Sequence, residues 1–156
     1  MLVEVTEITP LPIERVWDVV NDVEAYPRLM EHVRSLQILE RGPNFRVTAW
    51  EVDLKGCTMR WVEREEIDPE RHRIEYRQIK GDLAIFEGFW QLQRLTDQSC
   101  QTVLSVQFDI GIPMLSEMLN PVAERTIRDN SQKMLASLGA HAVHQAAQGE
   151  SVSESR

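Results

Sequence analysis

Between about residues 34 and 110, apolar and polar residues alternate in six successive segments. Alternation with a period of two is typical of β-strands that bury one face. Short sequences rich in turn-forming residues, such as Gly42-Pro43-Asn44 and Lys80-Gly81-Asp82, join the segments. Connections this short exclude the crossovers of about a dozen residues that parallel neighbours require. The sequence therefore predicts an antiparallel meander, with strands at about 34–41, 44–53, 58–67, 72–80, 84–95 and 100–110.

The flanking segments add one strand and three helices. Residues 2–9 also alternate and predict a first strand, which ends before Pro10. Apolar residues at helical spacing predict a short helix over 12–21, and a second short helix is predicted over 23–31. A longer apolar stripe at the same spacing predicts a third helix over roughly 115–146.

These elements predict the fold class. A single sheet must cover its apolar face, and the C-terminal helix is the largest element available to do so. We therefore predict an α+β domain over 1–147, a helix-grip fold whose curved seven-stranded antiparallel sheet wraps around that helix. The small polar residues that follow predict a disordered tail over 148–156. A strongly twisted sheet around one helix rarely fills its own interior, so we also expect an apolar pocket between them.

Charge argues against several classes of partner. The 156 residues include 17 Lys and Arg against 25 Asp and Glu, which gives a net charge of −8 with histidine neutral. A negative surface repels nucleic-acid phosphates, so we expect no nucleic-acid partner. No apolar run has the length of a transmembrane segment, and the first residues do not resemble a signal peptide, so we expect a cytoplasmic protein.

The sequence carries no motif of a metal or cofactor site. His141 and His144 lie near the end of the predicted long helix, without cysteine or acidic neighbours at ligand spacing. Cys57 and Cys100 do not form a C-x-x-C pair and are expected to be reduced. We therefore expect no metal and no cofactor.

The order of elements resembles the START/Bet v 1-like (SRPBCC) helix-grip superfamily, and within it the polyketide cyclase/dehydrase group. The similarity is clearest in Pro12-Ile-Glu-Arg-Val-Trp17-Asp-Val-Val-Asn21-Asp22-Val-Glu-Ala-Tyr26-Pro27. It continues in Met59-Arg-Trp61, Tyr76-Arg77-Gln78 and Gly88-Phe-Trp90. Coenzyme Q-binding START proteins have a similar N-terminal segment, so the resemblance is more specific to the superfamily than to one branch.

The resemblance implies a pocket with aromatic walls and polar groups that polarise ketones. It places Arg77 on a pocket arginine of the family, whereas a second arginine position is Glu65 here. A tyrosine position is Val33, and a glutamine position is Val106, so part of the family's polar set is absent. The side chains expected to bind ligand are Tyr26, Met30, Trp61, Phe86, Trp90, Val106, Phe108, Met118 and Ile127.

Arg77 and Glu65 are the candidate catalytic residues, and each has a structural alternative. A guanidinium could stabilise a ketone or enolate oxygen. The local alternation, however, places Ile74 and Tyr76 on the apolar face and turns Arg77 toward solvent. Glu65 is either a general base or a structural counter-ion that pairs with Arg77 across the sheet.

We hypothesise that the protein binds a hydrophobic, oxygen-bearing ligand and cyclises or aromatises a poly-β-ketone chain delivered by an acyl carrier protein. The alternative is a non-catalytic carrier of a quinone or lipid, of the coenzyme Q-binding START type.

Overall fold

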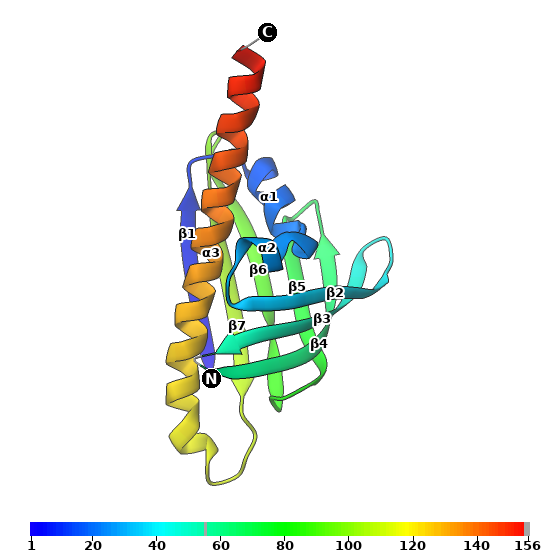
Figure 1. The fold of residues 1–156 in the computed structure, drawn as a ribbon, viewed down its shortest axis with the longest axis vertical. Coiled ribbons are helices and arrows are strands. Elements are labelled where there is room, and N and C mark those ends of the chain that lie inside the picture. The colour runs from blue at the N-terminus through cyan, green and yellow to red at the C-terminus, as the bar shows by residue number, and fades with distance from the viewer. Residues whose placement is uncertain (55, 155–156) are drawn as a thin grey trace.

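The computed structural model describes residues 1–54 and 56–154. Its centre is one curved antiparallel sheet in the spatial order β1-β7-β6-β5-β4-β3-β2, shown in Figure 1. The strands are β1 (Leu2–Thr9), β2 (Val33–Arg41), β3 (Phe45–Leu54), β4 (Cys57–Asp68), β5 (Arg73–Gly81), β6 (Ile85–Thr96) and β7 (Ser99–Asp109). The predicted α+β helix-grip fold is confirmed.

The meander and the first strand form one continuous sheet. Strands β2 to β7 pair in sequence order, as the short connections predicted. Strand β1 pairs with β7 from Leu2 opposite Gln107 to Thr9 opposite Cys100. The N-terminal strand thus extends the sheet at the β7 edge, beside the long helix (Figure 1).

Three short helical segments follow β1: α1 (Ile13–Asn21), η1 (Val23–Ala25) and α2 (Tyr26–Leu29). The apolar face of α1, which includes Val16, Trp17 and Val20, is buried in the core. The Tyr26 hydroxyl donates a hydrogen bond to the Val20 carbonyl oxygen and joins α2 to α1 inside the protein. These segments close one end of the interior that the sheet surrounds.

Helix α3 (Ser116–Glu154) covers the inner face of the sheet. It packs mainly along β1, contacts α1, and touches β3 at fewer places. Its buried side, which includes Leu135, Leu138 and Ala142, belongs to the main core. The helix extends beyond its predicted end near residue 146, so the residues predicted as a tail, 148–156, are helical as far as Glu154. Residues 155 and 156 lie outside the described part of the chain.

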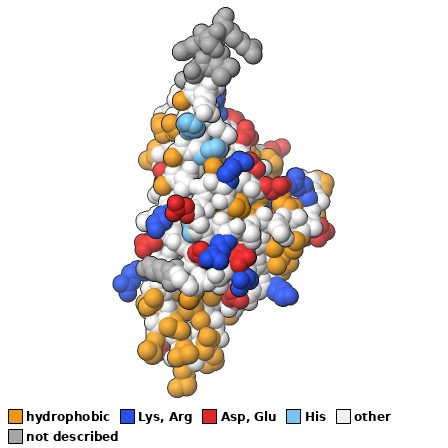
Figure 2. All heavy atoms as spheres, viewed as in Figure 1, with side chains coloured by type: hydrophobic (Ala, Val, Ile, Leu, Met, Phe, Trp, Pro, Cys, Tyr) orange, Lys and Arg blue, Asp and Glu red, His pale blue; other side chains and the backbone are white. Residues whose placement is uncertain are grey.

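An exposed apolar surface surrounds the start of α3. It consists of Ile112, Met114, Leu115, Met118, Leu119 and Val122. Figure 2 shows these hydrophobic side chains gathered at the lower end of the molecule. None of the helices in the described residues is long and apolar enough to cross a membrane.

Candidate functional site

A cavity lies between the inner face of the sheet and α3. Side chains from β3, β4, β5, β6 and β7 line one side, and Ile127, Asn130, Ser131 and Met134 of α3 line the other. The volume of this cavity is about 70 Å³. That is enough for a few water molecules, because one water needs roughly 10–15 Å³ on the same measure. The predicted hollow between sheet and helix is present, and its walls are largely apolar.

Aromatic rings form much of the cavity wall. The rings of Trp50 and Trp61 are stacked, with centroids 5.4 Å apart and planes at 10°. They face each other because Trp50 on β3 lies directly opposite Trp61 on β4. The Phe86 ring lies 5.0 Å from Trp61 and 5.9 Å from Tyr76. This continuous aromatic surface suits a flat or unsaturated apolar ligand.

Glu63 brings a carboxyl group into this apolar wall. It is 4% exposed and lines the cavity beside Trp61, whose indole Nε1 donates a 2.7 Å hydrogen bond to Glu63 Oε1. Burial raises the pKa of the Glu63 carboxyl well above its usual value, and the nearby carboxylate of Glu65 raises it further. This environment favours the protonated form of the Glu63 carboxyl, which can donate a hydrogen bond.

Glu65 is paired with an arginine from a different strand than predicted. Arg46 Nε on β3 donates to Glu65 Oε1 at 2.6 Å, and the Thr48 hydroxyl donates to Glu65 Oε2 at 2.7 Å. Arg46 Nη1 also donates to the backbone and side-chain oxygens of Asn21, each at 2.9 Å. With both oxygens accepting hydrogen bonds, Glu65 acts as a structural counter-ion. Its partner is Arg46, so the predicted pairing with Arg77 is wrong.

Tyr76 is held against the wall by a hydrogen bond to β7. Its hydroxyl donates to the Ser105 carbonyl oxygen at 2.8 Å. Gly88 lies directly opposite Tyr76, and a Cβ at Gly88 would collide with that same oxygen. Burial raises the pKa of Tyr76, and the Glu63 carboxyl adds to this effect. The phenol therefore stays protonated and is used in this internal bond.

His32 supplies a polar atom at another side of the cavity. Its Nε2 is buried and has no hydrogen-bond partner among the described residues. Burial lowers the pKa of His32, and the positive charge of Lys133 lowers it further. His32 is thus neutral at pH 7 and leaves one ring nitrogen available to a ligand.

Arg77 lies on the outer face of the sheet, so the structure does not bring it to the cavity. It is exposed and lies opposite Arg64 on β4 and Glu87 on β6. Its neighbour Tyr76 points inward, and successive residues of a strand point to opposite faces. The orientation implied by the resemblance is wrong at this position, whereas the one indicated by the local alternation is confirmed.

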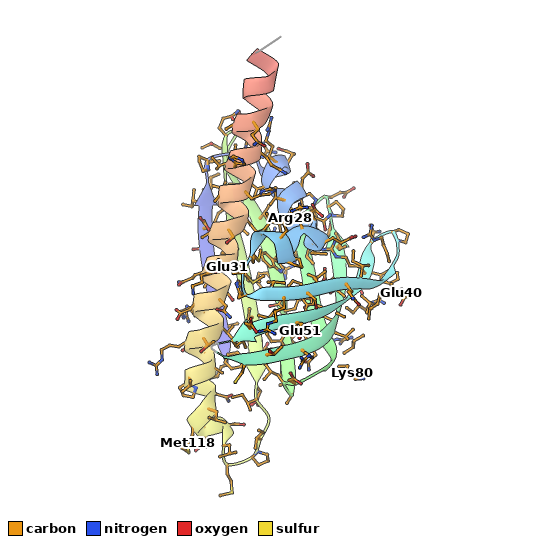
Figure 3. The ribbon with its side chains drawn as sticks, viewed as in Figure 1. Arg28, Glu31, Glu40, Glu51, Lys80 and Met118 are labelled. Atoms are coloured by element: carbon orange, nitrogen blue, oxygen red, sulfur yellow. The ribbon has the colours of Figure 1, made fainter. Side chains whose placement is uncertain are left out.

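The remaining predicted ligand-binding residues fall into three groups. Trp61, Phe86, Trp90, Val106 and Ile127 line the cavity. Tyr26, Met30 and Phe108 are buried in the surrounding core but are not part of the cavity wall. Met118 is 71% exposed and belongs to the apolar surface at the start of α3, where Figure 3 labels it. It is therefore not part of the cavity wall in which it was expected.

Sequence reasoning missed Glu63, Trp50 and His32 as cavity residues. Glu63 had a signal, because it alternates with Trp61 and Glu65 on one strand face. Trp50 lies opposite Trp61 in the register between β3 and β4, which the sequence pattern alone does not determine. His32 precedes β2 without any periodic pattern, so only the fold reveals its position. The described residues contain no group of three or more side chains that could hold a metal ion.

Comparison with known proteins identifies the family of this chain. The family described as polyketide cyclase / dehydrase and lipid transport matches residues 9–135. The ribosome association toxin RatA of Pseudomonas aeruginosa is 26% identical over 115 residues, which cover 74% of this chain and 79% of the toxin. The actinorhodin polyketide synthase bifunctional cyclase/dehydratase of Streptomyces coelicolor is 30% identical over 139 residues. That match covers 83% of this chain but only 40% of the Streptomyces protein.

Solved structures show the same fold. The Zhui aromatase/cyclase from a Streptomyces species has a TM-score of 0.88 and 25% identity, covering 94% of this chain and 95% of that one. A Thermus thermophilus protein has a TM-score of 0.87 and 24% identity, covering 93% and 99%. Since the family match spans most of the sequence, the chain belongs to the polyketide cyclase / dehydrase and lipid transport family, within the START/Bet v 1 (SRPBCC) superfamily.

Proposed function

We propose that the protein binds a hydrophobic, oxygen-bearing ligand in its internal cavity and directs the cyclisation or aromatisation of a poly-β-ketone chain. The observation that carries the proposal is Glu63, a buried carboxyl group in an aromatic wall whose pKa is raised by burial. A carboxyl group buried in an apolar wall costs free energy, which the hydrogen bond from Trp61 offsets only at one of its two oxygens. The names of the Streptomyces relatives, a cyclase/dehydratase and an aromatase/cyclase, support the same reaction class.

The cavity supports cyclisation in two ways. Its aromatic walls restrict a flexible chain to few conformations, and confinement close to a reactive geometry removes entropy from the barrier. The Glu63 carboxyl can donate a hydrogen bond to a ketone oxygen, which polarises the carbonyl for attack by a neighbouring enol carbon. This role replaces the one that the sequence suggested for Arg77. An acyl carrier protein that delivers the chain is part of the proposal.

A second candidate function is the carriage of a quinone or lipid without chemistry. It is supported by the lipid transport named in the family description. It is also supported by the lining of the cavity, in which the described residues include no Lys or Arg. The ribosome association named for RatA receives no such support, because a net charge of −8 opposes contact with RNA phosphates.

Filling the cavity tests the cyclase function. Ser131 on α3 is buried and lines the cavity, whereas its neighbour Gln132 is exposed. A poly-β-ketone synthase is assayed with and without this protein. With the Ser131→Leu variant, the products should shift toward those that the synthase forms alone. Gln132→Leu is the matched control and should give wild-type products. Arg77→Ala should also match wild type, because Arg77 lies on the outer face. Wild-type products from a folded Ser131→Leu variant would contradict the proposal.

Native mass spectrometry distinguishes the carrier from the cyclase. The protein is purified from its own host and transferred to the gas phase with bound molecules intact. A retained quinone or lipid, combined with a synthase product profile that the protein does not alter, would favour the carrier over the cyclase.

A further inference from the structure

The pairing of β3 with β4 fixes the order of side chains along the cavity. Opposite pairs in sequence are Val52 with Met59, Trp50 with Trp61, and Thr48 with Glu63. Each step of two residues advances about 6.6–6.8 Å along a strand. Met59, Trp61 and Glu63 line the cavity, whereas Glu65 does not. Glu63 is therefore the last residue of β4 to reach the cavity, and it marks the inner end.

The region behind this inner end holds a buried ion pair next to the Glu63 carboxyl group. Arg46 forms an ion pair with Glu65, whose carboxylate lies near Glu63, and Arg46 also bonds to Asn21. Neither Arg46 nor any other arginine or lysine is among the described residues that line the cavity. His32 lines the cavity but is neutral at pH 7, because burial and Lys133 lower its pKa. Among the described residues that line the cavity, an anionic ligand would find no cation.

A neutral oxygen would find a donor instead. The Trp61 indole N–H donates to Glu63 Oε1 and fixes that side of the carboxyl group. A proton on Glu63 then lies on the other oxygen, which interacts with Glu65 in the ligand-free protein, and a ligand carbonyl would compete with Glu65 for that proton. A ligand carbonyl accepts such a bond without bringing a charge into an apolar site. A ligand carboxylate would lose its hydration and lie close to Glu65.

We propose that the inner end of the cavity, formed by Glu63 and the Trp61 indole, selects ligands that present an uncharged carbonyl oxygen and rejects carboxylates of the same shape. The inference rests on the proposed function only in taking this cavity as the ligand site. The ligands selected are neutral ketones and quinones. Free fatty acids that enter the cavity with the carboxylate group first are excluded.

Three naphthalene-sized probes test the selection by isothermal titration calorimetry at pH 7. They are 2-acetylnaphthalene, a neutral ketone; 2-ethylnaphthalene, its hydrocarbon counterpart; and 2-naphthoate, a carboxylate. A ketone probe is chosen over a quinone because Cys57 is an exposed free thiol that a quinone could alkylate. We expect the ketone to bind wild type at least tenfold more tightly than 2-naphthoate and severalfold more tightly than 2-ethylnaphthalene.

Two variants assign the selection to Glu63. Glu63→Gln keeps an N–H donor and an oxygen acceptor for Trp61, so it should keep the preference for the ketone over the hydrocarbon. Glu63→Leu removes the donor and should bind the two neutral probes equally. Circular dichroism on both variants verifies that they are folded. Ser131→Leu should weaken binding of all three probes if they occupy this cavity.

The outcomes separate this inference from the proposed function. If 2-ethylnaphthalene or 2-naphthoate binds as tightly as the ketone and Ser131→Leu weakens that binding, the selection is wrong although the cavity is a ligand site. A ketone preference that persists in a folded Glu63→Leu variant also overturns the role of Glu63. If no probe binds, or if Ser131→Leu has no effect on binding, both the selection and the proposed function fail.

Discussion

At the scale of single residues, Glu63 and Glu65 show how two carboxyl groups on one strand face receive different roles. They lie two residues apart on β4, and both are buried. Glu65 lies opposite Arg46 and pairs with it, whereas Glu63 lies opposite Thr48 and has no cation to pair with. A buried carboxyl without a cation takes up a proton, and one with a cation is stabilised as the anion. The cross-strand neighbour therefore decides which carboxyl can donate a hydrogen bond.

The raised pKa of Glu63 predicts a pH-dependent stability. In the unfolded chain its carboxyl ionises near pH 4.5, but in the folded protein it stays protonated to higher pH. The native state thus binds more protons, so the free energy of unfolding falls as pH rises from 4.5 toward the folded pKa. The slope reaches about 1.4 kcal/mol per pH unit. Glu63→Gln removes this titration, so its stability relative to wild type should increase with pH.

Urea unfolding at pH 5, 6, 7 and 8 measures that difference. Glu4→Gln, at an exposed position on β1, is the matched control and should differ from wild type by a constant amount. A difference between Glu63→Gln and wild type that does not change with pH would show that Glu63 ionises at its ordinary value.

Arg46 gives a second prediction at this scale. Arg46→Met leaves the Glu65 carboxylate buried without its cation, and loss of one partner of a buried ion pair costs about 3–5 kcal/mol. Replacing both partners by apolar residues avoids the uncompensated charge. Urea unfolding should therefore find the double variant Arg46→Met/Glu65→Leu more stable than Arg46→Met. A double variant that is less stable than the single one would contradict this account.

At the scale of secondary-structure elements, the sequence determined the strands better than the ends of the helices. Alternation and short turns predicted all seven strands within a few residues, because a half-buried strand must repeat every two positions. The same alternation correctly predicted that the Arg77 side chain faces solvent. Helix α3 continues past residue 146 because its backbone bonds are local and do not require an apolar stripe.

The site was less predictable than the elements. Trp61 and Trp90 were identified from the resemblance to the family, whose pockets have aromatic walls, and both line the cavity. The Arg46–Glu65 pair depends on the register between β3 and β4, which a sequence pattern leaves open. Met118 occupies an apolar position of the helical pattern, but α3 begins beyond the part of the sheet that could cover it. Spacing therefore predicted a buried face at a place where no partner surface exists.

Gly88 allows two strands to approach each other behind the cavity wall. A Cβ there would overlap the Ser105 carbonyl oxygen and would lie 2.8 Å from the Tyr76 hydroxyl. Gly88→Ala should therefore lower stability by about 1–3 kcal/mol through overpacking, measured by thermal or urea unfolding. Gly149→Ala is the control, since its Cβ would meet open space on a helix and should leave stability unchanged or slightly higher. Equal stability of Gly88→Ala and wild type would show that β6 and β7 can separate at low cost.

At the scale of the whole molecule, the cavity is smaller than the ligands that the family description implies. Its free space holds a few waters, so a ligand of several rings requires the walls to move apart. Helix α3 is packed along β1 and α1 but touches β3 at few places. One of these contacts is a 3.3 Å hydrogen bond from Asn130 Nδ2 to the Asp53 carbonyl oxygen, next to the cavity. The weakly held side of α3, facing β3, is therefore the route by which we expect a ligand to enter.

Asn130→Ala tests this route. Removing the hydrogen bond to Asp53 should make the opening between α3 and β3 more frequent, so 2-acetylnaphthalene should both enter and leave faster than in wild type. Stopped-flow measurement of tryptophan fluorescence reports both rates, because Trp50, Trp61 and Trp90 line the cavity. Gln132→Ala, an exposed change on the same helix, should leave both rates unaltered. If both rates rise together, the interface between α3 and β3 is the mouth of the cavity. If only the dissociation rate rises, Asn130 contacts the ligand, and the ligand enters elsewhere.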